Sequence, residues 1–147
     1  MEKSKRKVFD KRNPSDEREG RFFIPLPSDA KHYIHHDKID AGKLFLFALI
    51  IDYYNEDLGY AFPSRERLSV DYGKTSKTTG NHLRDLEKAG LIEIPARGKY
   101  VPLEPLSEKE FYETYPKAWT NYKKSYQNFE KRREADLARL RRFRASK

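Results

Sequence analysis

The chain of 147 residues contains no cysteine. This absence excludes disulfides, thiolate catalysis and cysteine-based zinc sites, and it agrees with a reducing compartment. The sequence also lacks an apolar run of about eighteen residues and a leading signal segment, so we expect neither a membrane span nor secretion. No glycine-rich phosphate loop of Walker type is present, so an ATP-driven step is not expected of this chain. Together these absences favour a cytoplasmic protein.

Catalytic side chains are scarce as well. His32, His35 and His36 lie close to Asp29 and Asp37 in the sequence, which suggests a metal or nuclease site. Strand-borne relaxase sites use a His-apolar-His pair, whereas here the spacing is His-Tyr-Ile-His and the adjacent histidines would point apart on a strand. Packed or solvated histidines are the favoured interpretation. We therefore expect no enzyme activity, no metal and no cofactor.

The positive charge is concentrated at one end of the chain. The net charge is +8, and the segment 117–147 holds eleven Lys/Arg against three Asp/Glu, which equals the whole excess. The remainder, residues 1–116, sums to zero. A basic excess of this size favours a polyanionic partner.

The segment 62–92 carries the most information. Ser64 and Thr75 are each placed to cap a helix, and Gly73 lies between the two helices where a tight turn is needed. Gly90 would end the second helix, and LIEIP follows with the alternation of a half-buried strand. The first helix carries Leu68 inward, and the inward positions of the second are Thr79, Leu83 and Leu86. This pattern predicts a helix-turn-helix.

The outward face of the second helix supplies the candidate contacts. If Thr79, Leu83 and Leu86 face inward, the opposite side carries Ser76, Lys77, Gly80, Asn81, Arg84 and Asp85. Arginine, lysine and asparagine can read base edges in the major groove, and the start of a helix favours a phosphate. The predicted DNA contacts are Thr75, Ser76, Lys77, Thr78, Asn81 and Arg84, supported by Ser64, Arg65 and Lys74.

The strand that follows the second helix, 91–94, and another candidate strand, 100–103, flank the loop Pro95-Ala96-Arg97-Gly98-Lys99. This hairpin would form a wing beside the second helix. Arg97 and Lys99 at its tip can enter a minor groove or simply keep an exposed turn solvated, and the sequence leaves both alternatives open.

These residues resemble the winged helix-turn-helix of bacterial plasmid and phage replication initiators and related phage-type regulators. The matching positions are Gly59, Tyr60, Ala61, Phe62, Pro63, Ser64, Leu68, Gly73, Thr75, Thr78, Leu83, Leu86, Gly90, Leu91 and Ile92. The resemblance implies double-stranded DNA binding and a role in replication, partition or transcriptional control of a mobile element. Three residues depart from the family pattern: Thr79, Gly80 and Asn81.

The remaining N-terminal segments are simpler. Residues 1–21 are polar and without apolar period, which predicts a disordered arm. Residues 22–27 are expected to form a short strand. Their prolines cannot donate hydrogen bonds to a neighbouring strand, which would keep this strand at the edge of a sheet. Residues 41–54 are apolar nearly all round, which predicts a core helix. The DNA-binding domain is expected to span residues 22–106.

Residues 107–147 are expected to form a helical extension. Ser107 can cap a first helix, Pro116 separates it from a second, and apolar residues then recur at alternating spacings of three and four. This stripe comprises Trp119, Tyr122, Tyr126, Phe129, Leu140 and Phe143, interrupted by Arg133 and Asp136. It fits a seam between two chains or docking onto the protein's own core, and its basic flanks can also bind phosphates.

The fold class expected from these features is α/β, mainly α: a winged helix-turn-helix with a long C-terminal helical extension. The expected function is sequence-specific DNA binding, most simply as a homodimer, with a replication, partition or host protein as a further partner and a location on the nucleoid or plasmid. A dimer would bind two half-sites near one helical turn apart. The alternative is a winged-helix protein docking module with a basic C-terminal arm.

Overall fold

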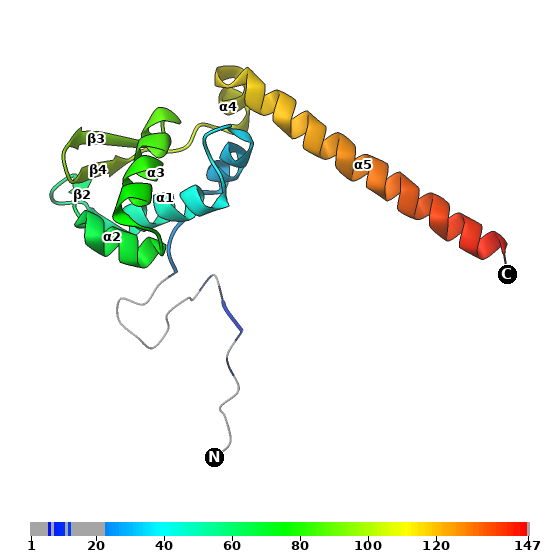
Figure 1. Ribbon diagram of the computed structural model, residues 1–147, viewed down its shortest axis with the longest axis horizontal. Coiled ribbons are helices and arrows are strands. Elements are labelled where there is room, and N and C mark those ends of the chain that lie inside the picture. Colours follow the sequence, from blue (N-terminus) through cyan, green and yellow to red (C-terminus); the bar gives the residue numbers. More distant parts are fainter. Residues whose placement is uncertain (1–5, 7, 11, 13–22, 147) are drawn as a thin grey trace, which may run out of the picture.

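The computed structural model describes residues 6, 8–10, 12 and 23–146. The chain is mainly helical, with a small antiparallel sheet, and is a winged helix followed by a long C-terminal helix (Figure 1). The predicted arm 1–21 lies almost entirely outside the described residues. In chain order the elements are η1 (Ser28–His35), α1 (Ala41–Tyr53), β1 (Tyr54–Asn55), β2 (Tyr60–Ala61), α2 (Arg65–Tyr72), α3 (Ser76–Lys88), β3 (Ile92–Ala96), β4 (Lys99–Pro102), α4 (Glu108–Thr114) and α5 (Pro116–Ala145).

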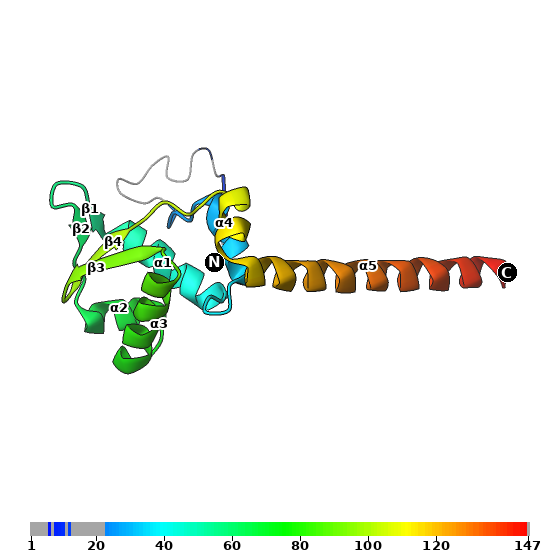
Figure 2. The ribbon, with the colours of Figure 1, turned by 90° about the horizontal axis from the view of Figure 1, so that it is seen from above.

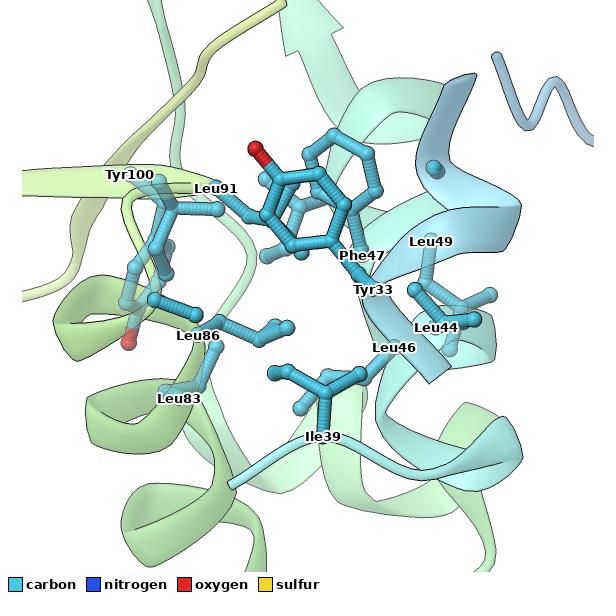
Figure 3. Close-up of a cluster of buried hydrophobic side chains, with 14 of the residues drawn as sticks. Tyr33, Ile39, Leu44, Leu46, Phe47, Leu49, Leu83, Leu86, Leu91 and Tyr100 are labelled. Carbon is cyan, nitrogen blue, oxygen red and sulfur yellow. The ribbon is translucent and has the colours of Figure 1, made fainter. Parts of the chain in front are cut away.

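Helix α1 lies at the centre of the core. Asp40 caps its start by accepting a hydrogen bond from the backbone N–H of Lys43 at 2.8 Å. The helix packs against α2, α3, β4 and η1, so it is covered on several sides, and Figure 3 shows its apolar side chains meeting those of α3, the sheet and η1. Its buried residues are Leu44, Leu46, Phe47, Ala48, Leu49 and Ile50. The burial of these residues confirms the prediction of a core helix. Full burial of each large side chain contributes roughly 1.5–3 kcal/mol to the stability of the fold.

The strand expected at residues 22–27 was a wrong prediction. Residues 23–27 have no regular structure, and the chain then forms the 3-10 helix η1; Phe22 lies outside the described residues. Pro25 and Pro27 lack the N–H that a sheet ladder needs. In η1, Tyr33 is buried and its hydroxyl accepts a hydrogen bond from the N–H of Leu106 at 3.0 Å.

The sheet contains a pair of strands that the sequence did not predict. Its order is β1-β2-β4-β3, with every neighbouring pair antiparallel. Strands β1 and β2 have two residues each, and Gly59 turns between them with a φ of 79°. Strands β3 and β4 form the predicted wing hairpin, so the winged-helix prediction is confirmed.

The caps of the helix-turn-helix form as predicted. Ser64 accepts a hydrogen bond from the N–H of Arg67, and Thr75 accepts one from the N–H of Thr78, each at 3.1 Å. Gly73 has a φ of 72° and Gly90 a φ of 78°, values that favour glycine. The N–H of Leu91 bonds the carbonyl of Leu86 at 3.0 Å, which completes a Schellman end for α3.

Helices α4 and α5 follow the wing and lie on the η1 side of the body. Ser107 caps α4, accepting from the N–H of Glu110 at 3.3 Å, and Pro116 stands in the first turn of α5. Phe111 is fully buried and Ala118 is 2% exposed, so both belong to the hydrophobic core. Beyond its first turns α5 extends away from the body as one long helix (Figures 1 and 2).

The stripe on α5 is divided between two environments. Trp119 and Tyr122 lie against Tyr112, with ring centroids 5.2 and 5.7 Å away, and the Tyr122 ring also meets His35 at 5.3 Å. Every described residue from 123 to 146 is exposed. The first part of the stripe therefore docks on the protein's own core, whereas the part from Tyr126 onward does not.

Polar contacts hold the same junction. Asn121 donates hydrogen bonds to the His35 carbonyl at 2.9 Å and to the Asp37 carboxylate at 3.1 Å, and Lys117 pairs with Asp37 at 2.9 Å. The neighbouring His36 ring packs on Tyr115 at 4.6 Å. Burial lowers the pKa of His35 and of His36 below the usual value, with the nearby His32 adding to the effect at His35.

Acidification should loosen this junction. Because the pKa of His35 and of His36 is lower in the folded protein than in an open chain, protons bind preferentially to the undocked state. Docking should be complete above the ordinary histidine pKa of about 6.5 and weaken as the pH falls below it. The protection factors of the amides of residues 117–122, which are corrected for the intrinsic pH dependence of hydrogen exchange, should fall accordingly. In the His35→Gln/His36→Gln variant the protection factors should no longer depend on pH in this range. Equal protection factors in wild type on both sides of this pKa would contradict the interpretation.

Candidate nucleic-acid interface

Helix α3 presents the outward face that the sequence predicted, with two exceptions. Thr79, Leu83 and Leu86 are buried, and the exposed side carries Ser76, Lys77, Asn81 and Arg84. Thr78 is half-buried, and the Thr75 hydroxyl is used in the helix cap. The exceptions are Asp85 and Gly80.

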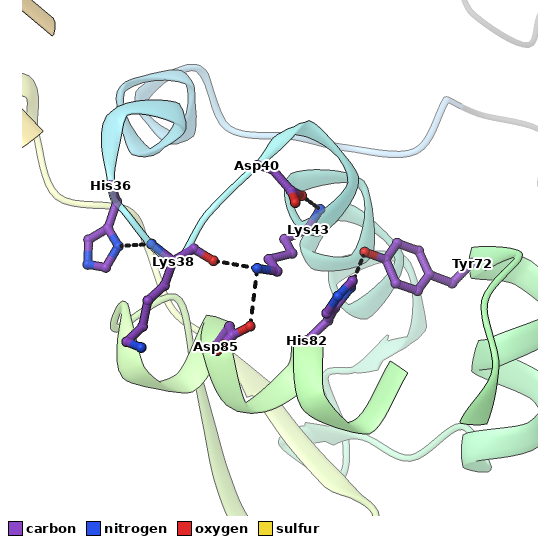
Figure 4. Close-up of polar contacts among 7 residues, drawn as sticks. All are labelled: His36, Lys38, Asp40, Lys43, Tyr72, His82 and Asp85. Atoms are coloured by element: carbon purple, nitrogen blue, oxygen red, sulfur yellow. Dashed lines mark hydrogen bonds and ion pairs between the residues drawn. The ribbon is translucent and has the colours of Figure 1, made fainter. Parts of the chain in front are cut away.

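Asp85 turns towards α1. Its carboxylate pairs with the Lys43 ammonium at 3.1 Å, and Lys43 also donates to the Lys38 carbonyl at 2.8 Å (Figure 4). The two charged side chains are 14% and 25% exposed, so the pair is largely shielded from water. This contact holds α3 against α1 and removes a negative charge from the outward face.

A second contact, about one helical turn earlier in α3, also orients this helix. The Tyr72 hydroxyl and His82 Nδ1 are 2.8 Å apart, and the two rings meet edge to face (Figure 4). Burial, helped by the Asp40 carboxylate, raises the pKa of Tyr72 to about 12, so the hydroxyl stays protonated. His82 is therefore a half-buried residue packed against Tyr72.

Helices α2 and α3 approach closely where the sequence departs from the family pattern. The Ser69 and Thr79 hydroxyls are hydrogen bonded at 3.2 Å within the buried contact. Gly80 is buried rather than outward, because the Arg65 side chain of α2 crosses over it: a Cβ at this position would lie 2.9 Å from Arg65 Nη1 and 3.0 Å from its Cζ. The glycine thus provides room for the Arg65 guanidinium.

A polar recess lies where the starts of α2 and α3 meet the wing. Its volume is about 420 Å³, and its lining includes Ser64, Arg65, Ser76 and Arg97. Two guanidinium groups beside a helix start provide the donors that bind a phosphate. The sequence indicated these residues individually, but their convergence depends on the fold.

The wing residues differ in their surroundings. Arg97 is exposed at the turn, where Gly98 has a φ of 77°. The Lys99 ammonium lies over the Tyr60 ring, 4.7 Å from its centroid, which directs it across the sheet to β2. Lys74 is exposed in the turn between α2 and α3. Of the two predicted wing contacts, Arg97 is the better placed.

The histidine segment serves packing in this structure. His32 lies against Tyr112, with ring centroids 5.8 Å apart, in the same junction as His35 and His36. Within residues 6, 8–10, 12 and 23–146, no group of three or more His, Cys, Asp or Glu side chains is placed to hold a metal ion.

Comparison with known proteins identifies the central motif. Residues 40–92 match the family described as a helix-turn-helix domain, which covers the segment from the cap of α1 to the start of β3. A solved structure of TrmBL2, described as an archaeal chromatin protein with a novel mode of DNA binding, is 18% identical with a TM-score of 0.39; the match covers 76% of this chain and 40% of that one. No curated protein matches.

Residues 40–92 are therefore similar to a helix-turn-helix domain, and in the structure the β3–β4 hairpin adds a wing to α2 and α3. Neither match is described as a replication initiator. None of the helices in the described part of the chain is both long and apolar enough to cross a membrane.

Replacing Gly80 by alanine should displace Arg65 without unfolding the domain. The new Cβ meets the flexible end of Arg65, which can move, while alanine favours a helix by about 0.5–1 kcal/mol over glycine. Thermal unfolding should show unchanged or slightly higher stability, and the NMR signal of the Arg65 Nε–H should shift. In an Arg65→Ala background the same substitution should give the full helix gain. A loss above roughly 2 kcal/mol would mean that the crossing of α2 and α3 cannot adjust.

Proposed function

We propose that this protein binds double-stranded DNA in a sequence-specific manner, with α3 in the major groove and the wing beside it. The observation that carries the proposal is the exposed set Lys77, Asn81 and Arg84 on one face of the second helix of a helix-turn-helix domain. Arginine and asparagine form bidentate contacts with guanine and adenine, and Ser76 and Lys77 lie where a helix start favours a phosphate.

The distribution of charge supports this orientation. Several carboxylates near the domain surface already have cationic or hydroxyl partners: Asp85 pairs with Lys43, and Asp71 is hydrogen bonded by Tyr53 and lies 3.7 Å from Arg67. The exposed cations around α3 and the wing include Lys74, Lys77, Arg84, Lys88 and Arg97. The outward face of α3 that carries Lys77, Arg84 and Lys88 is therefore basic, although residues 1–116 carry no net charge.

The biological role that we propose is control of a bacterial mobile element, plasmid or phage, through replication initiation, partition or transcription. The protein would act in the cytoplasm on the element's DNA as a homodimer, without a cofactor and without enzyme activity. The resemblance of residues 59–92 to replication initiators and phage-type regulators supports this role. Recovering the fragments that the protein retains from its own genome tests it, because an origin, a centromere-like array and a promoter point to different roles.

Alanine substitutions on α3 and the wing should distinguish contacts to DNA bases from contacts to DNA phosphates. Asn81→Ala and Arg84→Ala should each weaken binding to a site selected from random duplexes by about 1–3 kcal/mol, with little effect on unrelated DNA. Lys77→Ala and Arg97→Ala should lower affinity for all duplexes and reduce the salt dependence, because they remove phosphate contacts. Fluorescence anisotropy at several salt concentrations measures both effects.

Lys109→Ala provides the matched control, since this exposed lysine lies on α4 and outside the proposed interface. It should leave both affinities nearly unchanged. If the Asn81→Ala/Arg84→Ala double variant retains the selected site as tightly as wild type, α3 is not the reading helix, and a protein docking function with the basic C-terminal helix as its arm becomes the better proposal.

A further inference from the structure

The outer part of α5 carries an apolar stripe that its own body does not cover. The helix has 30 residues, and all described positions from 123 to 146 are exposed. Large apolar side chains nevertheless recur along one side of this part, with exposures of 49% for Tyr126, 58% for Phe129, 44% for Leu140 and 58% for Phe143. Alternating spacings of three and four residues are typical of a seam between two helices. A partner helix would shield this stripe from water.

Two charged residues at seam positions indicate which partner helix pairs with α5 and whether the pair is parallel or antiparallel. Arg133 and Asp136 continue the same spacing between Phe129 and Leu140. If two copies of α5 paired in parallel, each seam residue would face itself, so Arg133 would meet Arg133 and Asp136 would meet Asp136. In an antiparallel pair, Arg133 of one copy faces Asp136 of the other, and twofold symmetry forms this contact twice.

We propose that α5 pairs with α5 of a second copy in antiparallel orientation, with the twofold axis beside residues 134 and 135. The same register places Phe129 opposite Leu140 and Tyr126 opposite Phe143, so apolar residues meet on both sides of the charged pairs. Asp136 already accepts a hydrogen bond from Arg139 of its own helix at 3.1 Å, and a carboxylate can accept from both guanidinium groups.

The length over which the two α5 helices would pair agrees with the point where the contacts of α5 with its own body end. In this register residue 145 of one helix lies beside residue 124 of the other, so pairing begins where the docking of Trp119 and Tyr122 on the body ends. The basic excess of the segment 130–147, eight Lys/Arg against three Asp/Glu, opposes association. Much of it, including Lys131, Arg141 and Arg142, lies at positions pointing away from the seam, where water and salt screen it.

This arrangement refines the homodimer of the proposed function and changes its expected DNA spacing. With an axis beside residue 134 and a rise of 1.5 Å per residue, the two starts of α5 are about 55 Å apart. One turn of DNA spans only about 34–36 Å. In each copy, α3 and the body lie on the side of the α5 start that faces away from the outer end of α5 (Figures 1 and 2), so the two α3 helices are farther apart than these starts. Two half-sites separated by two turns or more therefore fit better than the single turn expected from the sequence.

Charge exchange in the full-length chain tests the pairing. Arg133→Glu places a glutamate opposite Asp136, and Asp136→Arg places an arginine opposite Arg133, so sedimentation should show each single variant dissociating at least about tenfold more readily than wild type. The double variant Arg133→Glu/Asp136→Arg should recover the wild-type dimer. Because these residues are exposed and distant from the core, circular dichroism and thermal unfolding of the body should be unchanged.

Each other outcome overturns the proposal. A wild-type monomer at tens of micromolar means that the outer part of α5 does not self-associate and serves another partner, such as a phosphate backbone. A dimer unaffected by both single variants and by the double variant means a seam that does not oppose Arg133 to Asp136, as in parallel pairing.

Crosslinking gives an independent measure of direction, since the natural chain has no cysteine. Phe129→Cys and Leu140→Cys chains should form a disulfide when mixed, because opposed residues bring their Cα atoms within about 7 Å. Neither variant should crosslink alone, because in this register position 129 lies about 16 Å along the axis from its own copy. Efficient self-crosslinking of Phe129→Cys would establish parallel pairing. These measurements need no DNA, so failed DNA binding and a failed dimer remain distinguishable.

Discussion

The enclosure of α1 is the constraint on which the rest of the structure depends. A helix that is apolar around most of its circumference must be shielded on several sides, and α2, α3, the sheet and η1 take up those positions. Leu83 and Leu86 place one side of α3 in this core, while the Lys43–Asp85 pair sets its rotation. The outward direction of Asn81 and Arg84 follows from how the core is filled. The direction of the face that we propose to contact DNA is thus a consequence of packing.

Two of the three departures from the family pattern, Thr79 and Gly80, have a shared cause in the crossing of α2 and α3. A large aliphatic residue in place of Thr79 would crowd Ser69 and lose its hydroxyl contact, and any side chain at position 80 would meet Arg65. Small residues at the crossing therefore let the Arg65 guanidinium of α2 reach across α3. Arg65 and Arg97 then line one recess although they are far apart in sequence. Gly80 lowers helix propensity relative to alanine and leaves the space that the Arg65 guanidinium occupies.

Local signals made the helix-turn-helix predictable, whereas contacts between segments far apart in the sequence could not be predicted. Ser64, Gly73, Thr75 and Gly90 act on their own neighbours, so their roles could be inferred from the sequence. Strands β1 and β2, with two residues each, are too short for a periodic pattern. The burial of Gly80 depends on a side chain of another helix. The stripe on α5 has the same spacing whether its rings meet the protein's own tyrosines or a second chain, so only the fold could divide it after Tyr122.

The burial of Phe111 and Ala118 bears on how this module can be excised or fused to other proteins. The family match ends at residue 92, and the wing at Pro102, yet the Phe111 ring packs on Tyr33 at a centroid distance of 4.4 Å and the Tyr115 hydroxyl bonds the Ala89 carbonyl at 2.9 Å. A fragment cut behind the wing would expose the apolar side of η1 to water and invite aggregation. The smallest fragment that keeps this core covered therefore extends through Tyr122, because the first turns of α5 shield the apolar side of η1 and α4.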